Sequence, residues 1–407
     1  MRILVVTQYF YPEQFRINEI CSKLIKLGNF VTVITGRPNY PEGEFFKGYE
    51  EYKKNDSYDG VEIIRANVRP RHKGAINLFF NYVSFVRQCS REICKLNKTF
   101  DLIYIYGLSP ISIAIPAIKY KKRIKIPIYY YCLDIWPESV RDSIGKRRRM
   151  SKLNPIYIFS LFLSMYVYKN MDFISTKCDD FCAYLASVCK VPYSKMNVIP
   201  EYAESLYLKV SENTISNGIV DFVFLGNIGK IQNCEMIIKA AQIIKEKEFM
   251  IHFVGDGSDL GRIKKMVEEL NMSDKIVFYG RVSIQETIHF YNLADVCLLT
   301  LDNQTSSGLT PPGKLYSYLA SGRTILGSIN GETQKIIRDA DCGFCVAAND
   351  TNSFVDKMNY FIDNPSCLAS FGKNSRRFFL ENFTLEKYIA RTTAVFDLLC
   401  QHRDYYE

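Results

Sequence analysis

The amino-acid sequence predicts an α/β protein with two doubly wound parallel sheets, one in each half of the chain. Short apolar runs alternate with helical patterns, first at residues 2–35, where RILVVT, a helical segment ending at Gly28 and VTVIT form a βαβ unit. A second alternating series begins with IVDFVFLG at residue 219. The chain has 407 residues, more than one core usually organises, which favours two domains with a ligand cleft between them.

The remaining elements follow in order along the first half. After a long turn-rich loop, further strands are predicted at VEIIRANV, DLIYIYG, IPIYYYCLD and DFISTKC, which are residues 61–68, 101–107, 126–134 and 172–178. This series ends near residue 202. The polar segment SENTISNGI, residues 211–219, is the candidate linker because it lacks apolar periodicity.

The second half repeats the alternation. A helix is predicted over residues 233–247, and strands at MIHFVGDG, KIVFYG, ADVCLLTL and RTILGSI, which begin at residues 250, 275, 294 and 323. Beyond Asp350 the pattern is helical to the end of the sequence. Two such series indicate two sheets of the same general type.

Composition narrows the function classes. A formal net charge of +9 suits anionic substrates or an anionic membrane surface, but without a basic motif it does not indicate nucleic acid. Thirteen cysteines and four histidines show no disulfide or metal-ligand spacing, so we expect reduced thiols, a cytoplasmic protein and no metal. Met1-Arg2 enters a strand directly, so no signal peptide is expected. The longest apolar stretch, residues 156–168, is shorter than the roughly 20 residues of a spanning helix.

The stretch TSSGLTPPGKLYSYLASGRTILG, residues 305–327, carries the strongest signal of an anion site. It follows a predicted buried strand, a small-residue loop interrupts it, and Pro311-Pro312-Gly313 opens a helix that ends at Ser321-Gly322. A helix N-terminus at the carboxyl edge of a sheet attracts anions. Lys314 in the first turn opposes the helix dipole unless an anion offsets it, which predicts a bound phosphate. The alternative is an ordinary helix cap beside a solvated lysine.

Two other strand ends are candidates. FLGNIGK, residues 224–230, resembles a phosphate-binding turn with Lys230 beside it, although a tight turn that needs glycine explains it equally well. In YCLDIWPES, residues 131–139, Asp134, Trp136 and Glu138 follow an apolar strand, where a carboxylate can orient a sugar hydroxyl. The alternative is that Asp134 forms a turn and Trp136 packs in the core.

A family resemblance rests on these motifs together with others along the chain: YFYPEQFRINEI, TGRPNYPEGEFF, LDIWPES, LGNIGKIQ, PGKLYSYLASGR, SINGETQKIIRDADCGF and the FT-LEKY tail. Jointly they resemble the family-4 glycosyltransferases with the GT-B fold, closest to the bacterial O-antigen and capsule branch that includes fucosamine transferases. The resemblance runs from Arg2 to about Val395. It implies an acceptor-side domain (1–205), a nucleotide-sugar domain (206–380) and a C-terminal helix (381–407) that crosses back.

The resemblance also implies roles for individual residues. Lys230 and Lys314 match positions that hold the diphosphate, Arg281-Val282 would lie beside the base, and Asp134 would face the sugars. The loop around Leu309-Thr310 would supply backbone N–H groups, and Glu332 matches the glutamate of the SINGE-type turn. We also assign Asn227, Gly229, Trp136 and Glu138 to substrate binding. The sequence departs from the family pattern in three places: Leu309 and Ser317 replace a Glu-x7-Glu pair, Asn227 replaces an arginine, and Phe15-Arg16 replaces a double glycine.

The implied activity is metal-independent, retaining transfer of an N-acetylamino or deoxyamino hexose from a UDP-linked donor. The implied acceptor is a lipid-diphosphate-linked saccharide of surface polysaccharide synthesis, and no cofactor is expected. Two alternatives stay open: a GT-B-like sugar-nucleotide epimerase, and a non-catalytic assembly subunit.

A basic-aromatic segment predicts peripheral attachment to the inner face of the cell membrane. Arg69, Arg71 and Lys73 precede a helix that carries Phe79 and Phe80, and such a combination suits anionic lipid. The alternative is a solvated charge run followed by a core helix.

Overall fold

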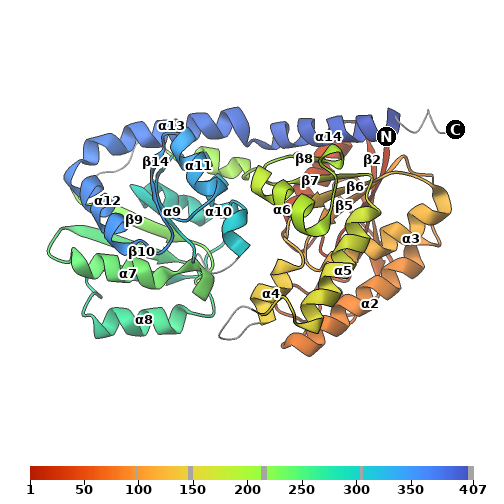
Figure 1. Ribbon diagram of the computed structural model, residues 1–407, viewed down its shortest axis with the longest axis horizontal. Helices are drawn as coiled ribbons and strands as arrows, with labels where there is room; N and C mark the ends of the chain where they lie inside the picture. Colours follow the sequence, from red (N-terminus) through yellow and green to blue (C-terminus); the bar gives the residue numbers. More distant parts are fainter. Residues whose placement is uncertain (98, 145–149, 212–217, 303–305, 402–407) are drawn as a thin grey trace. The chain divides into compact units, whose positions relative to one another are not determined.

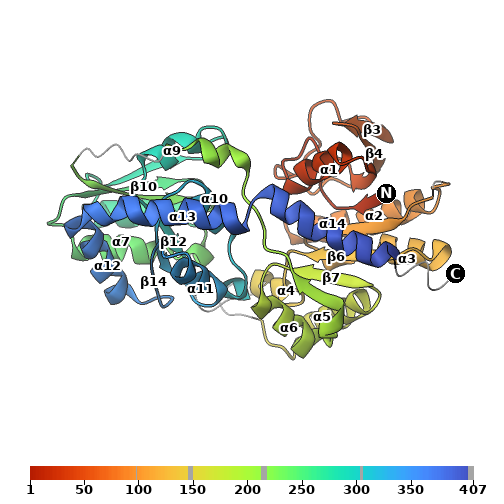
Figure 2. The same cartoon turned by 90° about the horizontal axis from the view of Figure 1, so that it is seen from above.

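The computed structural model describes residues 1–97, 99–144, 150–211, 218–302 and 306–401. The chain forms two compact units (Figures 1 and 2). The first contains residues 1–199 and the C-terminal residues from Ile389, and the second contains Pro200–Tyr388. Each unit is a sheet of mainly parallel strands packed with helices, which confirms the predicted fold class.

The first unit has an eight-stranded sheet of order β3-β4-β2-β1-β5-β6-β7-β8. Its strands are β1 Arg2–Val6, β2 Phe30–Gly36, β3 Asn55–Tyr58, β4 Val61–Ala66, β5 Leu102–Gly107, β6 Ile128–Cys132, β7 Phe173–Thr176 and β8 Met196–Val198. Its helices are α1 Arg16–Lys26, α2 Ala75–Ile93, η1 Ile111–Ala114, α3 Ile115–Ile124, α4 Glu138–Ile144, α5 Pro155–Lys169, α6 Asp179–Cys189 and η2 Tyr193–Lys195. Helix α14, Leu385–Gln401, adds Phe396, whose ring lies 5.5 Å from that of Tyr104 on β5.

Like the short strand β8, strand β3 is not predicted from the sequence pattern. It pairs antiparallel with β4 at the edge of the sheet, through a two-residue turn at Asp59-Gly60. Both turn residues have positive φ, 46° and 80°, which is the conformation that Asp-Gly favours in a tight hairpin. The strand sequence NDSY has no apolar alternation, so the Asp-Gly pair was the available signal.

The second unit has a six-stranded parallel sheet of order β11-β10-β9-β12-β13-β14. Its strands are β9 Val220–Leu225, β10 Phe249–Val254, β11 Ile276–Gly280, β12 Val296–Thr300, β13 Thr324–Ser328 and β14 Gly343–Val346. Its helices are η3 Ser205–Lys209, η4 Lys230–Gln232, α7 Cys234–Ile243, α8 Leu260–Glu269, α9 Thr287–Leu293, η5 Ser306–Leu309, α10 Gly313–Ala320, α11 Glu332–Asp339, α12 Thr351–Asp363, η6 Pro365–Cys367 and α13 Leu368–Asn382.

The central strands β9, β12 and β13 are buried along their whole length, because helices cover both faces of a doubly wound sheet. β9 and β12 pair at Phe222–Val296 and Val223–Cys297. Towards their carboxyl ends the hydroxyl of Tyr318 on α10 bridges them: it accepts from the N–H of Leu225 (3.1 Å) and donates to the carbonyl of Leu298 (3.1 Å). This buried hydroxyl ties α10 to both strands.

The unit boundaries in the structure fall after residue 199 and before residue 389, whereas the sequence analysis placed them at 205 and 380. Most of the candidate linker, residues 212–217, lies outside the described residues. All thirteen cysteines are free thiols. Among the described helices, none combines the length and apolar character needed to cross a bilayer.

Gly255 allows the loops after β9 and β10 to touch, and its substitution should destabilise the second unit. A Cβ atom at Gly255 would lie 1.9 Å from the carbonyl oxygen of Gly226, and φ at Gly255 is +143°. We expect Gly255→Ala to lower the free energy of unfolding by about 3 kcal/mol, from backbone strain and overpacking. Gly261→Ala on α8 is the matched control, because a Cβ there meets open space. Urea unfolding of both variants measures the effect, and equal stability would show that the loops are not in contact.

Candidate functional site

The second sheet has its topological switch point between β9 and β12. From this pair the strand order runs outward in both directions, to β11 on one side and to β14 on the other. Ligands of such sheets bind outside the carboxyl ends of the strands next to the switch point. We therefore expect a ligand-binding site at the residues that follow β9 and β12.

The loops after β9 and β10 are hydrogen-bonded to each other and form one rim at this edge. The N–H of Gly226 donates to the carbonyl of Val254 (2.9 Å), and the N–H of Ile228 donates to the carbonyl of Asp256 (2.9 Å). A Cβ at Gly226 would lie 3.4 Å from Cε of Lys314, so the absence of a side chain there leaves room for the lysine. The loop after β9 and the first turn of α10 thus converge.

Lys314 lies at this convergence in an unusual environment. The residue as a whole is half-buried, but its Nζ atom is shielded from solvent and has no hydrogen-bond partner among the described residues. Nζ lies 3.7 Å from the centre of the Phe224 ring on β9, a cation–π contact. Burial lowers the pKa of Lys314 to about 8, while the thiols of Cys234 and Cys297 act in the opposite direction. An ammonium with an aromatic face and no anion is a group that an anionic ligand would satisfy.

Lys230 and its turn lie on the same rim. Lys230 is exposed at the start of η4. Gln232 organises the turn: its Oε1 accepts from Nδ2 of Asn227 (3.0 Å) and from the N–H of Gly229 (3.2 Å). Asn227, which stands where the family resemblance leads one to expect an arginine, therefore supports the turn through its side chain.

The other predicted residues of the second unit lie at strand ends of the same sheet. Leu309 ends the η5 turn, Thr310 follows it before α10, and helix α11, which packs against η5, begins with Glu332. Glu332 pairs with Lys335 on its own helix at 3.2 Å. Arg281 is exposed and Val282 packs on the core, both following the edge strand β11. The structure thus groups the Lys230, Lys314 and Leu309 regions around the switch point and places Arg281 further along the edge.

In the first unit, Asp134 follows β6 and is half-buried. Its Oδ2 accepts from the backbone N–H of Ser109 in the loop after β5 (2.9 Å), and Nε1 of Trp136 donates to Oγ of Ser109 (3.1 Å). Asp134 and Trp136 therefore hold the loop after β5, which is next to the switch point between β1 and β5. This role is compatible with ligand contact, which stays a prediction.

Glu138 has partners within its own unit. The residue is 2% exposed, and its carboxylate accepts from the hydroxyls of Tyr157 (2.9 Å) and Tyr184 (3.2 Å) and pairs with Arg141 (3.2 Å). These contacts account for a buried carboxylate without a ligand. The position of Glu138 after the strand predicts substrate binding, but the sequence does not show that the hydroxyls of two distant tyrosines bind its carboxylate.

Arg71 takes a different place from the one expected of a membrane-contacting residue. Its Nη1 donates to the hydroxyl of Tyr9 (3.1 Å), its guanidinium lies 5.2 Å from the centre of the Tyr40 ring, and its N–H donates to Asn39 (3.0 Å). The rings of Tyr9 and Tyr40 are 5.1 Å apart. Arg71 therefore joins an aromatic cluster after β1 and β2 at the carboxyl edge of the first sheet.

Glu13 organises the same loops and was not singled out from the sequence. It is 2% exposed, and its carboxylate accepts from the N–H groups of Asn39 (2.9 Å), Tyr40 (2.8 Å) and Phe10 (3.3 Å). Burial raises the pKa of Glu13 to about 7, although these three N–H groups act to lower it. A single buried carboxylate thus joins the loop after β1 to the loop after β2.

The remaining membrane candidates lie on or before α2. Lys73 and Arg69 are exposed, and the Arg69 guanidinium lies 5.2 Å from the Phe80 ring. Phe79 and Phe80 are 61% and 45% exposed. These residues form an accessible basic-aromatic surface.

The buried charge of Lys314 should lower the free energy of unfolding of the ligand-free protein. A lysine in the unfolded chain keeps its proton up to about pH 10.5, whereas Lys314 in the folded protein loses its proton near pH 8. Between these pH values the unfolded state binds more protons than the folded state, so the free energy of unfolding rises with pH. We expect Lys314→Met to raise the free energy of unfolding at pH 7 by about 2–3 kcal/mol. The advantage over wild type should shrink from pH 8 to 10.5.

Lys265→Met is the control, since the Lys265 side chain is 75% exposed. Urea unfolding across the pH range measures the difference. A Lys314→Met variant that is less stable than wild type at pH 7 would contradict the buried, unpaired ammonium.

Comparison with known proteins finds glycosyltransferases. Residues 211–378 match the family model described as Glycosyl transferases group 1. Among curated relatives, a probable glycosyltransferase WbjE of Pseudomonas aeruginosa is 28% identical over 42% of this chain and 43% of its own length. N-acetyl-alpha-D-glucosaminyl L-malate synthase of Bacillus anthracis is 25% identical over 46% and 48%. The chain thus matches less than half the length of these relatives.

Solved structures match nearly the whole chain. Sucrose-phosphate synthase from Thermosynechococcus elongatus has a TM-score of 0.77 at 14% identity, covering 98% of both chains. WaaG, a glycosyltransferase involved in lipopolysaccharide biosynthesis, has a TM-score of 0.68 at 13% identity, covering 97% and 99%. Anabaena Alr3699/HepE in complex with UDP has a TM-score of 0.67 at 12% identity, covering 98% and 100%. The protein therefore has the GT-B fold of these glycosyltransferases, and the segment that matches the group 1 glycosyl transferase model covers most of the second unit.

Proposed function

We propose that this protein is a glycosyltransferase that uses a nucleotide-diphosphate sugar, with the diphosphate bound at the switch point of the second unit. The observation that carries the proposal is the shielded, unpartnered ammonium of Lys314 at the start of α10. The positive end of the helix and the lysine act on the same point, so an anion there satisfies both. The match of residues 211–378 to group 1 glycosyl transferases lies over this site.

In this proposal the chemistry depends on charge at the leaving group. Departure of the nucleoside diphosphate develops negative charge on the phosphate oxygens, and fixed cations stabilise that charge most where water is excluded. Lys314 supplies a fixed cation, and exposed Lys230 supplies a second, more mobile one. We further propose that the transfer needs no metal and retains the anomeric configuration. The proposed donor is a UDP-linked N-acetylamino or deoxyamino hexose, and the proposed acceptor is a lipid-linked saccharide of surface polysaccharide synthesis.

The known relatives favour a UDP donor and a transferase over the alternatives. Three solved HepE complexes contain UDP, UDP and glucose, or UDP-glucose, and a trehalose-6-phosphate structure contains UDP-2-fluoro glucose. The curated relatives carry transferase or synthase names rather than epimerase names. The epimerase and the assembly subunit are therefore not favoured.

We further propose attachment to the inner face of the cell membrane. Exposed Arg69, Lys73, Phe79 and Phe80 support it, because basic and aromatic side chains together suit anionic lipid surfaces. Arg71 is left out of this surface, since it binds Tyr9.

Binding of UDP should be coupled to proton uptake by Lys314. At pH 8 the group is half protonated, and a bound diphosphate holds it fully charged, so we expect uptake of about half a proton per UDP bound. Titration calorimetry in two buffers of different ionisation enthalpy measures this. Lys314→Met should bind UDP about 100-fold more weakly and show no uptake, because it loses a charge-assisted contact in a buried place.

Lys265→Met should behave as wild type in the same titration. GDP and ADP run in parallel decide the base. If no nucleoside diphosphate binds the wild-type protein, or if Lys314→Met binds UDP unchanged, the proposed site is wrong.

Asp134 is expected to orient the acceptor hydroxyl rather than to act as an essential base. Asp134→Asn should keep the hydrogen bond from Ser109, so we expect little change in Tm and in UDP affinity while turnover falls by about 100-fold. Release of UDP from UDP-N-acetylhexosamines, with lipid-linked saccharides from bacterial membranes as acceptors, measures turnover. Ser109→Ala, which keeps the N–H bound by Asp134, is the local control. A folded Asp134→Asn variant with normal turnover would leave Asp134 a structural role only.

A further inference from the structure

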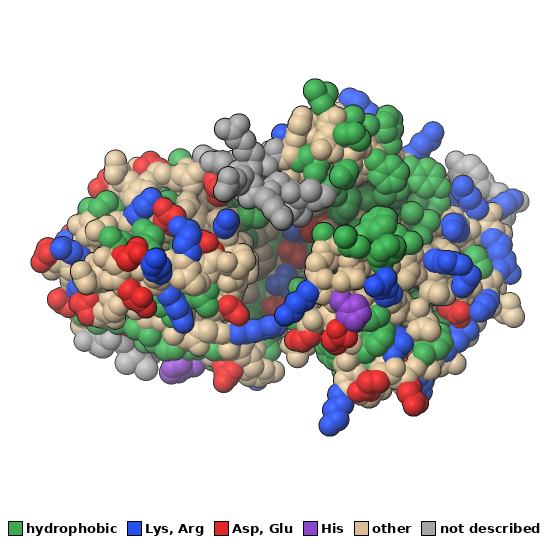
Figure 3. All heavy atoms as spheres, turned by 90° about the horizontal axis from the view of Figure 1, so that it is seen from below, with side chains coloured by type: hydrophobic (Ala, Val, Ile, Leu, Met, Phe, Trp, Pro, Cys, Tyr) green, Lys and Arg blue, Asp and Glu red, His purple; other side chains and the backbone are tan. Residues whose placement is uncertain are grey.

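Helix α5 presents an apolar face to solvent. Phe159 and Phe162 are 69% and 65% exposed, Ile156 is 51% exposed, and Leu153 just before the helix is 84% exposed. Tyr166 continues this face by one more turn. These residues recur at helical spacing, so they form one continuous stripe along α5. Figure 3 shows hydrophobic side chains gathered on this side of the first unit.

The opposite face of α5 is buried although it contains two serines. Ser160 and Ser164 are 3% and 0% exposed, and their hydroxyls donate to the carbonyls of Tyr157 (2.8 Å) and Ser160 (2.7 Å) on the same helix. A surface helix in water normally has the reverse arrangement, with serines outside and phenylalanines inside. The exposed large side chains of α5 are thus placed for contact with something other than water.

The segment of the chain that carries this stripe has a positive net charge. No Asp or Glu occurs between Asp142 and Asp172, and the same stretch of sequence contains Lys146, Arg147, Arg148, Arg149, Lys152 and Lys169. Of these, Lys152 and Lys169 lie in the described part of the structure, one before α5 and one at its last residue, and both are exposed. An apolar stripe whose own segment of the chain carries cations and no anions complements a surface with negative headgroups over an apolar interior.

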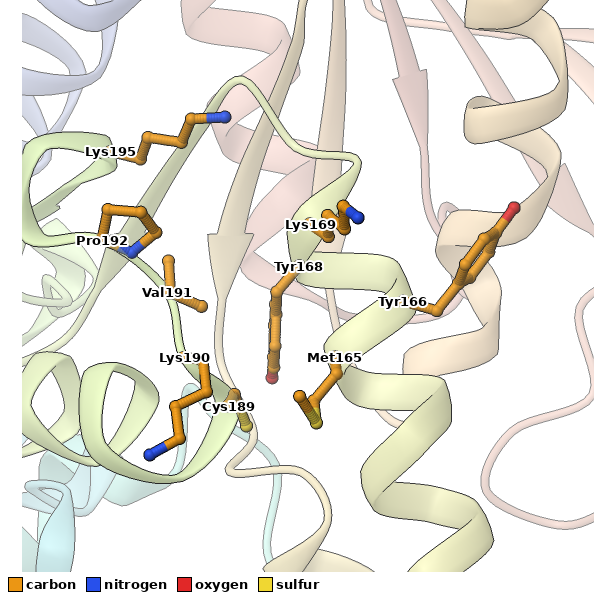
Figure 4. A pocket seen from close by; sticks show the side chains of 9 residues that line it. All are labelled: Met165, Tyr166, Tyr168, Lys169, Cys189, Lys190, Val191, Pro192 and Lys195. Carbon is orange, nitrogen blue, oxygen red and sulfur yellow. The ribbon is translucent and has the colours of Figure 1, made fainter.

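A pocket of about 380 Å³ lies at the C-terminal end of the stripe (Figure 4). Met165, Val191, Pro192 and the ring of Tyr168 give it apolar walls, and Tyr166 belongs both to the pocket and to the exposed stripe. In Figure 4 the amino groups of Lys169 and Lys195 lie towards one end of the pocket, away from Met165. The pocket therefore continues the pattern of the stripe, with apolar walls and cationic groups beside them.

We propose that α5 embeds in the surface of an anionic lipid bilayer, with its apolar stripe among the acyl chains and Lys169 and Lys195 at the headgroup phosphates. The helix has 15 residues, too few to cross a bilayer, so it lies along the interface. This proposal rests on the membrane location proposed above and adds α5 to the α2 surface. Helices α2 and α5 both pack against η1, which fixes their positions relative to each other.

Flotation with vesicles tests the proposal. The full-length chain should float with phosphatidylglycerol-containing vesicles, and Phe159→Ser combined with Phe162→Ser should lower its partition coefficient by about tenfold or more, because two phenylalanines leave the lipid. Phe30→Ser is the matched control, since Phe30 is 74% exposed in the same unit. Phe79→Ser combined with Phe80→Ser measures the separate contribution of α2.

The lysines and the depth of insertion are tested separately. Lys169→Ser combined with Lys195→Ser should reduce binding to phosphatidylglycerol vesicles and flatten its salt dependence. Phe162→Trp should be quenched by brominated lipid beyond the signal of the single native Trp136. Far-UV circular dichroism and Tm confirm that each variant is folded.

Three results would overturn the proposal: no flotation of the wild-type chain, equal flotation of the α5 double variant, or no quenching of Trp at position 162. If the α5 variant instead changes a dimer into a monomer by light scattering while flotation stays the same, the stripe is an interface between copies. UDP titration of the same samples keeps the two proposals apart, because vesicle binding requires no nucleotide.

Discussion

The second unit is built around one electrostatic constraint, a positive charge held away from water without a counter-charge among the described residues. The Phe224 ring and the strand ends around it exclude solvent from Lys314, and the glycine at position 226 provides the space that its side chain occupies. Such an arrangement opposes folding, which is why proteins retain it mainly where a ligand compensates it. Tyr318, one turn further along α10, fixes the helix to β9 and β12 and so keeps the lysine at the switch point.

The first unit has the same kind of sheet, and its constraint is the shape of its loops. Its loops are long, and buried polar side chains hold them: Glu13 joins the loops after β1 and β2, and Asp134 holds the loop after β5. Backbone N–H groups bound by fixed carboxylates give loops a defined shape without regular secondary structure. The carboxyl edge of this unit is therefore rich in aromatic and polar groups that hydrogen bonds hold in place.

Local sequence signals predicted α10 well, because Pro311-Pro312 and Ser321-Gly322 mark its two ends, and α10 spans Gly313–Ala320. They could not predict the burial of Lys314, which depends on Phe224, 90 residues earlier. Arg71 reads as part of a basic run, yet its partner Tyr9 lies 62 residues away. Strand β3 was missed because its polar sequence pairs only at the sheet edge. For α5 the sequence showed an apolar run, but which face points outward is decided by the helices and strands that pack against it.

The most direct measurement is the pKa of Lys314 itself, read from the Cε resonance of isotopically labelled lysine as the pH is raised. The structure predicts a pKa of about 8 in the free protein, because burial disfavours the charged form, and a rise to its ordinary value or above when UDP is bound. A pKa near 10.5 in the free protein, unchanged by saturating UDP, would contradict the claim that Lys314 is a buried cation that binds a diphosphate.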